Sequence, residues 1–190
     1  MTVLSKPERT PFSSLPPRSR RNDELRASTP YTESVDADSF DEQHFFETIA
    51  RSGARALVIG RRALVALGAP LLTADYDLWV HIDDIEILNA ALDDLDLAPN
   101  YAPSEARMRG RYVLEASEHV DVLIARSKTT KDGIVLTFDD AWSRRQNLPL
   151  GALAISIPSI DDLILTKRWA MREKDLADIA YLEDLKRHRP

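Results

Sequence analysis

One short segment constrains the fold more than any other, because it predicts a strand, a tight turn, a helix and a second strand in immediate succession. Residues 56–59 form an apolar run that is typical of a buried strand. Gly60 ends that strand, and residues 61–67 then carry apolar side chains at the spacing of one helix face. Gly68 stops the helix, and a second strand is predicted over 73–80. Strands that alternate with helices in this way predict an α/β protein.

Two acids stand two residues apart in the second predicted strand. Because side chains alternate along a strand, Asp75 and Asp77 project from the same side of it. The opposite side carries Tyr76, Leu78 and Val80. Adjacent carboxylates repel each other unless a cation lies between them, and hard oxygen ligands at this spacing suit Mg²⁺. The alternative is a solvated strand end that holds two acids without any ligand.

The order of these elements resembles the signature of the DNA polymerase β-like nucleotidyltransferases. The shared pattern is a strand, a glycine, a short helix, a second glycine and the motif T-x-D-x-D. The likeness is strongest to the small stand-alone bacterial members, which include the toxin-type nucleotidyltransferases of toxin–antitoxin systems. The resemblance implies that one segment supplies both the nucleotide site and the metal ligands. It assigns the nucleoside triphosphate to Gly60, Arg61, Arg62 and Thr73, and one or two Mg²⁺ ions to Asp75 and Asp77.

The chain departs from the family pattern at two positions. Arg61 stands where the family has a second Gly or Ser, and Leu71 stands where an Arg is common. A bulky side chain at position 61 blocks close approach of the backbone to a triphosphate. It also adds positive charge, together with Arg62, where an anion would bind. The sequence leaves both interpretations open.

A third acid completes the site that the resemblance implies. In the predicted strand HVDVLIA, Val120, Val122 and Ile124 share one face, and Asp121 lies on the other. An acid in an apolar strand is costly unless it is paired or coordinates an ion. Asp121 is therefore the expected third metal ligand, and the alternative is pairing with one of the nearby arginines, Arg107, Arg109 or Arg111.

The C-terminal part of the chain adds a basic residue to the expected cleft. Ser159 caps a predicted helix that runs to the end of the chain and carries Lys167 on its apolar side. A lysine there either extends its ammonium group to water or reaches into a phosphate site. The segment D-L-I-x-x-K-x-x-A-x-R-x-K-D-x-x-D-I resembles the C-terminal helical motif of the same family. That resemblance implies that Lys167 and Asp175, together with Asp178, line the cleft. Without the resemblance, Asp175, Asp178 and Lys174 belong to a solvated helix start.

The remaining patterns predict ordinary structural elements. Asp38 or Ser39 is the expected cap of a first helix, and Asp83 with Glu86 is the expected capping box of a later one. Residues 128–133 are expected to form a polar turn.

Composition narrows the class of protein. The chain has 190 residues and no cysteine, which excludes a disulfide framework and a thiolate metal site and fits a cytoplasmic protein. No apolar run is long enough to cross a membrane. The net charge is −6, although the first 30 residues are basic, so a broad nucleic-acid-binding face is not expected. Five prolines within residues 1–38 indicate a disordered tail, whose Arg18–Arg21 segment either contacts a partner or only aids solubility.

These patterns predict an α/β (α+β) fold in which a small mixed sheet bears the acids, helices flank it, and a C-terminal helical lobe closes the cleft. The expected domain covers residues 39–190. Residues 39–150 supply the catalytic sheet and helices, and residues 151–190 supply an edge strand and the C-terminal helices.

The expected function is Mg²⁺-dependent transfer of a nucleoside monophosphate from a nucleoside triphosphate to a hydroxyl group. The resemblance implies that the acceptor is tRNA, a protein or a small molecule, and that an antitoxin is a candidate partner. The catalytic residues would be Asp75, Asp77 and Asp121. The alternative is a non-catalytic member that acts as a binding or regulatory partner. A glycosyltransferase also uses D-x-D, but it needs a longer nucleotide-binding unit ahead of the acids than this chain has.

Overall fold

The computed structural model describes residues 40–188, which belong to one compact unit that begins at Asp38. Its centre is a five-stranded sheet with the strand order β1-β2-β5-β4-β3. β2 and β5 are parallel, and the other neighbours are antiparallel, so the predicted small mixed sheet is confirmed. The strands of this sheet are β1 (Ala56–Val58), β2 (Tyr76–Val80), β3 (Ala98–Pro99), β4 (Arg111–Glu115) and β5 (His119–Leu123).

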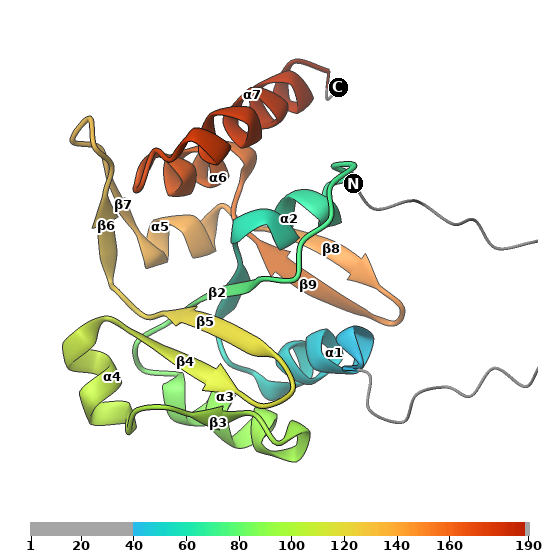
Figure 1. Ribbon diagram of the computed structural model, residues 1–190, viewed down its shortest axis with the longest axis vertical. Coiled ribbons are helices and arrows are strands. Elements are labelled where there is room, and N and C mark those ends of the chain that lie inside the picture. The colour runs from blue at the N-terminus through green and yellow to red at the C-terminus, as the bar shows by residue number, and fades with distance from the viewer. Residues whose placement is uncertain (1–39, 189–190) are drawn as a thin grey trace, which may run out of the picture. The chain divides into compact units, whose positions relative to one another are not determined.

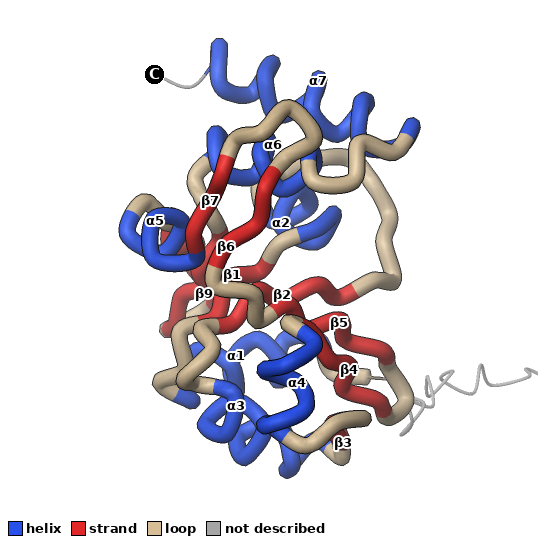
Figure 2. The backbone as a smooth tube through the Cα atoms, turned by 90° about the vertical axis from the view of Figure 1, so that its left-hand side faces the viewer, coloured by secondary structure: helices blue, strands red, loops and turns tan. Residues whose placement is uncertain are grey.

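Helices lie on both sides of this sheet. α1, α3 and α4 lie at one end of the described unit, and α2, α6 and α7 lie at the other, with the sheet between them (Figures 1 and 2). The helices are α1 (Glu42–Ser52), α2 (Gly60–Ala66), α3 (Ile85–Leu92), the short 3-10 helix η1 (Asp93–Leu95), α4 (Pro103–Arg109), α5 (Phe138–Ser143), α6 (Ile160–Arg168) and α7 (Glu173–His188). Within the described range, no helix combines the length and the apolar character that a membrane crossing requires.

The two central strands divide their side chains between a core and a polar face, as their alternating pattern predicts. Tyr76, Leu78 and Val80 of β2 are buried in the main core, where the apolar residues of α1 and α3 pack. In β5, Val120 and Val122 enter the same core. The opposite face therefore receives the acids, because neighbouring positions on a strand face opposite ways.

The first and last helices begin differently from the prediction. Asp41 caps α1, and its carboxylate accepts a hydrogen bond from the backbone N–H of His44 at 3.0 Å. The predicted caps Asp38 and Ser39, and the predicted tail over 1–38, lie outside the described residues. The prediction of a single long C-terminal helix is wrong, because α6 ends before Trp169 and a separate helix, α7, follows it.

Two smaller predictions differ from the structure, and a third is confirmed in its bounds. The Asp83–Glu86 capping box does not form, since Glu86 binds Arg107 and α3 starts after Asp84. Residues 128–133 are not a simple turn but part of a hairpin of β6 (Ser127–Thr129) and β7 (Val135–Thr137). The strand predicted over 153–157 is present as β9 (Leu153–Ile157), and it pairs with β8 (Gln146–Leu150) in a separate two-stranded sheet.

Candidate active site

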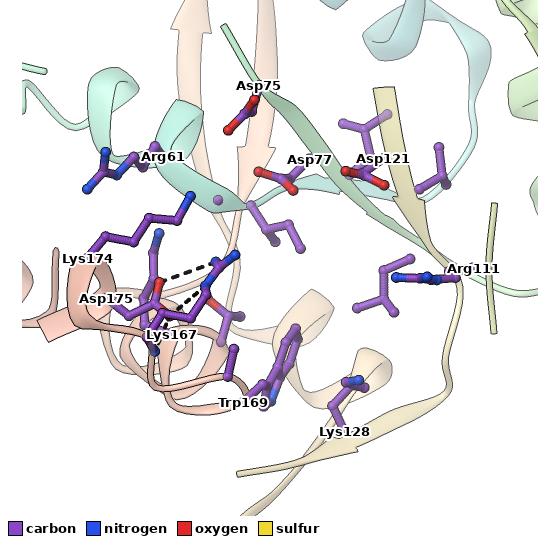
Figure 3. A pocket seen from close by; sticks show the side chains of 18 residues that line it. Arg61, Asp75, Asp77, Arg111, Asp121, Lys128, Lys167, Trp169, Lys174 and Asp175 are labelled. Carbon is purple, nitrogen blue, oxygen red and sulfur yellow. Dashed lines mark hydrogen bonds and ion pairs between the residues drawn. The ribbon is translucent and has the colours of Figure 1, made fainter. Parts of the chain in front are cut away.

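A pocket of about 360 Å³ opens between the polar face of the sheet and the C-terminal helices. Figure 3 shows acids from the sheet along one side of this pocket and basic side chains from the helices on the opposite side. Its charged lining residues are Arg61, Asp75, Asp77, Arg111, Asp121, Lys128, Lys167, Arg172, Lys174 and Asp175. The pocket therefore gathers side chains from segments that are far apart in the sequence.

Three acids form one side of the pocket, which we call the acid wall: Asp75, Asp77 and Asp121. Asp77 of β2 and Asp121 of β5 are register partners on parallel strands, so their side chains leave the sheet next to each other. Asp75 precedes β2, which starts only at Tyr76, and it is exposed. Burial raises the pKa of Asp77, and the nearby charges of Asp121 and Asp75 raise it further.

Gly60 fits against the acid wall in a way that no other residue can. It begins α2 with φ +66°, a backbone conformation that favours glycine. A Cβ atom at this position would lie 1.9 Å from Oδ2 of Asp77. The backbone N–H of Ile59 also donates to the carbonyl oxygen of Asp77 at 2.9 Å, which fixes the turn against β2. The glycine therefore makes room for the carboxylate of Asp77.

The opposite side, which we call the cation wall, consists of Arg61, Lys167 and Arg172. The ammonium group of Lys167 lies 2.8 Å from Oδ2 of Asp178, and Nε of Arg61 lies 3.2 Å from the same oxygen. The side chain of Asp178 is 1% exposed and that of Lys167 is 6% exposed, so this pair is buried. One carboxylate of α7 thus holds a cation from α2 and a cation from α6.

Arg172 is held in the same manner by Asp175. Its Nε donates to Oδ2 of Asp175 at 3.1 Å, and its backbone N–H donates to that oxygen at 2.8 Å. Burial alone would raise the pKa of Asp175, but these hydrogen bonds from Arg172 lower it. The backbone contact also caps the start of α7, directly after the turn at Met171, whose φ is +49°.

Most of the residues predicted from the sequence meet in this pocket. Its lining includes Gly60, Arg61, Asp75, Asp77, Asp121, Lys167 and Asp175. Arg62 and Thr73 are outside that lining. Arg62 donates to Glu42 of α1 at 2.7 Å and to the backbone carbonyl of Thr73 at 2.9 Å, and it lies over the ring of Tyr76. These two residues therefore fix the loop before β2, and their expected contact with a nucleotide stays a prediction.

Five other charged or aromatic residues of the pocket were not predicted as site residues. Arg172 and Lys174 lie inside the segment that resembles the family's C-terminal motif, so that motif was a signal for them. Arg111 of β4 was considered only as a possible partner of Asp121. Lys128 of β6 and Trp169, which follows α6, are connected to the site by no sequence pattern.

The acid wall has the chemistry of a magnesium site. Carboxylates are the hard oxygen ligands that Mg²⁺ prefers, and a cation would relieve the repulsion that raises the pKa of Asp77. The three acids share one wall of the pocket. However, no three His, Cys, Asp or Glu side chains within residues 40–188 are already grouped as ligands of one metal ion. The donor types fit a magnesium ion, although the residues are not preassembled around one.

No protein-family model matches the chain, and no curated protein matches it by sequence. Among solved structures, the lincomycin-bound lincosamide antibiotic adenylyltransferase LnuA is similar with a TM-score of 0.53 at 14% identity, over 76% of this chain and 98% of LnuA.

Two further solved structures are similar at lower scores. The antibiotic-resistance factor ANT(2'')-Ia has a TM-score of 0.47 at 12% identity, over 65% of this chain and 66% of its own. TM1012 of Thermotoga maritima, named as a candidate nucleotidyltransferase, has a TM-score of 0.46 at 11% identity, over 75% of this chain and 86% of its own. At these identities a likeness concerns the fold alone, and the likeness to LnuA shows that this chain has a nucleotidyltransferase fold.

Proposed function

We propose that this protein is a nucleotidyltransferase that moves a nucleoside monophosphate from a nucleoside triphosphate to a hydroxyl group. The observation that carries the proposal is the register pairing of Asp77 with Asp121 on parallel strands, opposite the cation wall of the same pocket. A triphosphate brings several negative charges, which basic groups and a metal ion must balance during transfer. The pocket offers both kinds of partner within one volume.

In the proposed reaction the acceptor oxygen attacks the α-phosphorus of the nucleotide. The new O–P bond forms as the bond from that phosphorus to the β-phosphate oxygen breaks, and pyrophosphate leaves. Asp121, whose side chain is 57% exposed, is the group that would take the proton of the acceptor hydroxyl. Lys167 and Arg172 would stabilise the negative charge on the departing phosphates.

Magnesium is the metal that the acid wall would hold, through Asp75, Asp77 and Asp121. When bound, Mg²⁺ would neutralise phosphate charge and increase the acidity of a coordinated hydroxyl group. Arg61 is the remaining basic group for the nucleotide, and it lies beside Gly60 with a partly exposed side chain.

The acceptor and the partners follow from the resemblance to the small bacterial enzymes. We keep tRNA, a protein hydroxyl and a small molecule as acceptors, an antitoxin as a protein partner, and the cytoplasm as the location. LnuA, which has the same fold, is named for a small-molecule acceptor.

A second candidate is a nucleotidyltransferase-fold protein that binds a nucleotide or a partner without catalysis. Two observations favour it: Arg62 is directed toward Glu42 instead of the pocket, and the acids are not preassembled as metal ligands among the described residues. In this candidate the pocket would bind a triphosphate and release it unchanged.

The test is transfer of label from each α-labelled nucleoside triphosphate, with Mg²⁺, to tRNA, to cell protein and to small-molecule pools. We expect transfer by the wild type and a loss of about 10²- to 10⁴-fold in Asp121→Asn, the range for removal of a general base. Asp94→Asn, which changes an exposed acid outside the pocket, is the control and should keep full activity. Binding without transfer would favour the second candidate in its nucleotide-binding form. No binding at millimolar triphosphate would exclude the transferase and leave only the partner-binding form of the second candidate.

A further inference from the structure

Trp169 lines the pocket but has no role in the proposed reaction. It follows the last residue of α6 and stands two positions after Lys167. Its indole is only partly buried, and it lines the pocket. Figure 3 shows the ring below the acid wall, with Lys128 to one side of it and Lys167 to the other.

The ring of Trp169 is held in place by its neighbours. It meets the fully buried Trp79 edge to face, with 5.1 Å between ring centroids and an angle of 88°. The ammonium group of Lys128 lies 5.8 Å from the centroid of the Trp169 ring. Aromatic pairs of this geometry are favourable, so the ring is fixed without help from a ligand.

Packing alone does not explain an indole at this position. The Nε1 atom of Trp169 is buried and has no hydrogen-bond partner among the described residues. A buried donor without a partner costs free energy, which a phenylalanine or leucine would avoid. The fully buried Trp79, by contrast, donates its Nε1–H to the carbonyl oxygen of Ala125 at 2.8 Å. A large aromatic surface in the pocket therefore has a use other than filling the core.

We propose that the base of the nucleoside triphosphate stacks on Trp169, an inference that rests on the proposed function. A nucleotide whose phosphates meet the cation wall has its base elsewhere in the same pocket, which Trp169 also lines. Trp169 supplies an aromatic surface next to Lys167, and every base has a π face that can stack on it. Because stacking does not read the edge of the base, the contact serves all four nucleotides.

The experiment compares a nucleotide with its phosphates alone. Calorimetry would measure binding of ATP, UTP and inorganic tripolyphosphate, each with Mg²⁺, to wild type, Trp169→Leu and Trp169→Phe. We expect Trp169→Leu to weaken both nucleotides by about 5- to 150-fold, the range for loss of one base–aromatic stack, and to leave tripolyphosphate unchanged. Trp169→Phe keeps an aromatic ring and should retain most of the nucleotide affinity.

A matched control and a second readout make the outcomes distinct. Trp142 stacks on Phe138 and lies outside the pocket lining, so Trp142→Phe should leave all three affinities unchanged. Nucleotides, but not tripolyphosphate, should quench tryptophan fluorescence in wild type and Trp142→Phe, and this quenching should vanish in Trp169→Phe. That readout remains decisive if Trp169→Leu fails to fold.

Three results would overturn the inference. Equal loss of nucleotide and tripolyphosphate binding in Trp169→Leu would mean that the indole only supports the cation wall. Unchanged nucleotide binding, or quenching that survives in Trp169→Phe, would mean that the base lies elsewhere while the proposed function stands. A wild type that binds neither nucleotide nor tripolyphosphate would remove the proposed function and this inference together.

Discussion

The two sides of the pocket are built on opposite electrostatic principles. In the acid wall, Asp77 and Asp121 lie side by side, and neither forms an ion pair with Lys or Arg among the described residues. In the cation wall, Lys167 and Arg61 share the buried Asp178, just as Arg172 is held by Asp175. The sheet thus presents carboxylates that have no ion pair with Lys or Arg among the described residues, which we call uncompensated, although the charges of Lys167 and Arg172 act on Asp77 from farther away. The helices present cations that already have carboxylate partners behind them.

This difference indicates which side a ligand would change more. A cation bound at the acid wall would remove repulsion that the folded chain otherwise carries, since the pKa of Asp77 is raised by burial and by its acidic neighbours. The basic groups of the cation wall are positioned before any ligand arrives, because buried carboxylates fix them. We therefore expect substitutions behind the cation wall to lower stability and substitutions in the acid wall to change activity.

The largest expected effect is on stability, when Asp178 is replaced by alanine. The change would leave the buried ammonium group of Lys167 without its carboxylate, and breaking a buried pair in this way costs about 3–5 kcal/mol. Urea unfolding of Asp178→Ala would measure the loss. In the double variant Asp178→Ala/Lys167→Met, much of the stability should return, because no unpaired charge remains at Lys167.

The matched control lies on the same helix. Asp184 pairs with Arg187 on the exposed side of α7, and such surface pairs contribute only about 0–1 kcal/mol. Asp184→Ala should therefore unfold almost like the wild type. A similarly small effect of Asp178→Ala would refute the view that the cation wall depends on a buried acid.

The next effect concerns activity, and it tests the junction of α2 with the acid wall. In Gly60→Ala the new methyl group would displace the carboxylate of Asp77, since its Cβ would lie 1.9 Å from Oδ2. A misplacement of about 1 Å at a reacting centre can cost roughly 10²-fold in rate. Label transfer at saturating nucleotide would measure this loss.

Gly68→Ala separates the displacement from backbone strain. Gly68 has φ +94°, but nothing lies within 4 Å of a Cβ atom built on it. Both variants should lose about 1–2 kcal/mol of stability from the left-handed conformation, and only Gly60→Ala should lose activity. Equal activity in the two variants would mean that Asp77 needs no fixed position.

The same division shows what the sequence could and could not predict. The acid wall follows from local patterns: period two in β2 and β5 places Asp77 and Asp121 on the polar face, and apolar neighbours fix the core face. No local pattern predicts the register that makes these two acids partners on neighbouring strands. The family resemblance implied only that the acids share one site.

The cation wall depends on contacts that no local pattern reveals. Arg61 reaches Asp178 across 117 positions, while its neighbour Arg62 binds Glu42 on the other side of α2. Successive helix residues point about 100° apart, so adjacent arginines need not share a site. The break between α6 and α7 was missed for a related reason, because it is stabilised by Asp175 bonding the backbone of Arg172 instead of by a Gly or Pro.

The smallest effect tests the uncompensated charge of the acid wall directly, through the pH dependence of stability. Because the folded pKa of Asp77 lies above its unfolded value, the folded state binds more protons than the unfolded state between the two pKa values. Stability from this group is therefore present below the unfolded pKa and is lost as pH rises through the folded pKa. Asp77→Asn removes that loss, so without divalent metal it should melt above the wild type at neutral pH, and the gap should close at acid pH.

Adding Mg²⁺ should raise the melting temperature of the wild type more than that of Asp77→Asn, since bound cation favours the folded state. Thermal melts from acid to neutral pH, with chelator or with Mg²⁺, would measure both changes, and Asp94→Asn should behave as the wild type throughout. A variant that is less stable than the wild type at neutral pH without metal would show that Asp77 is compensated after all, and that the contrast between the two walls is wrong.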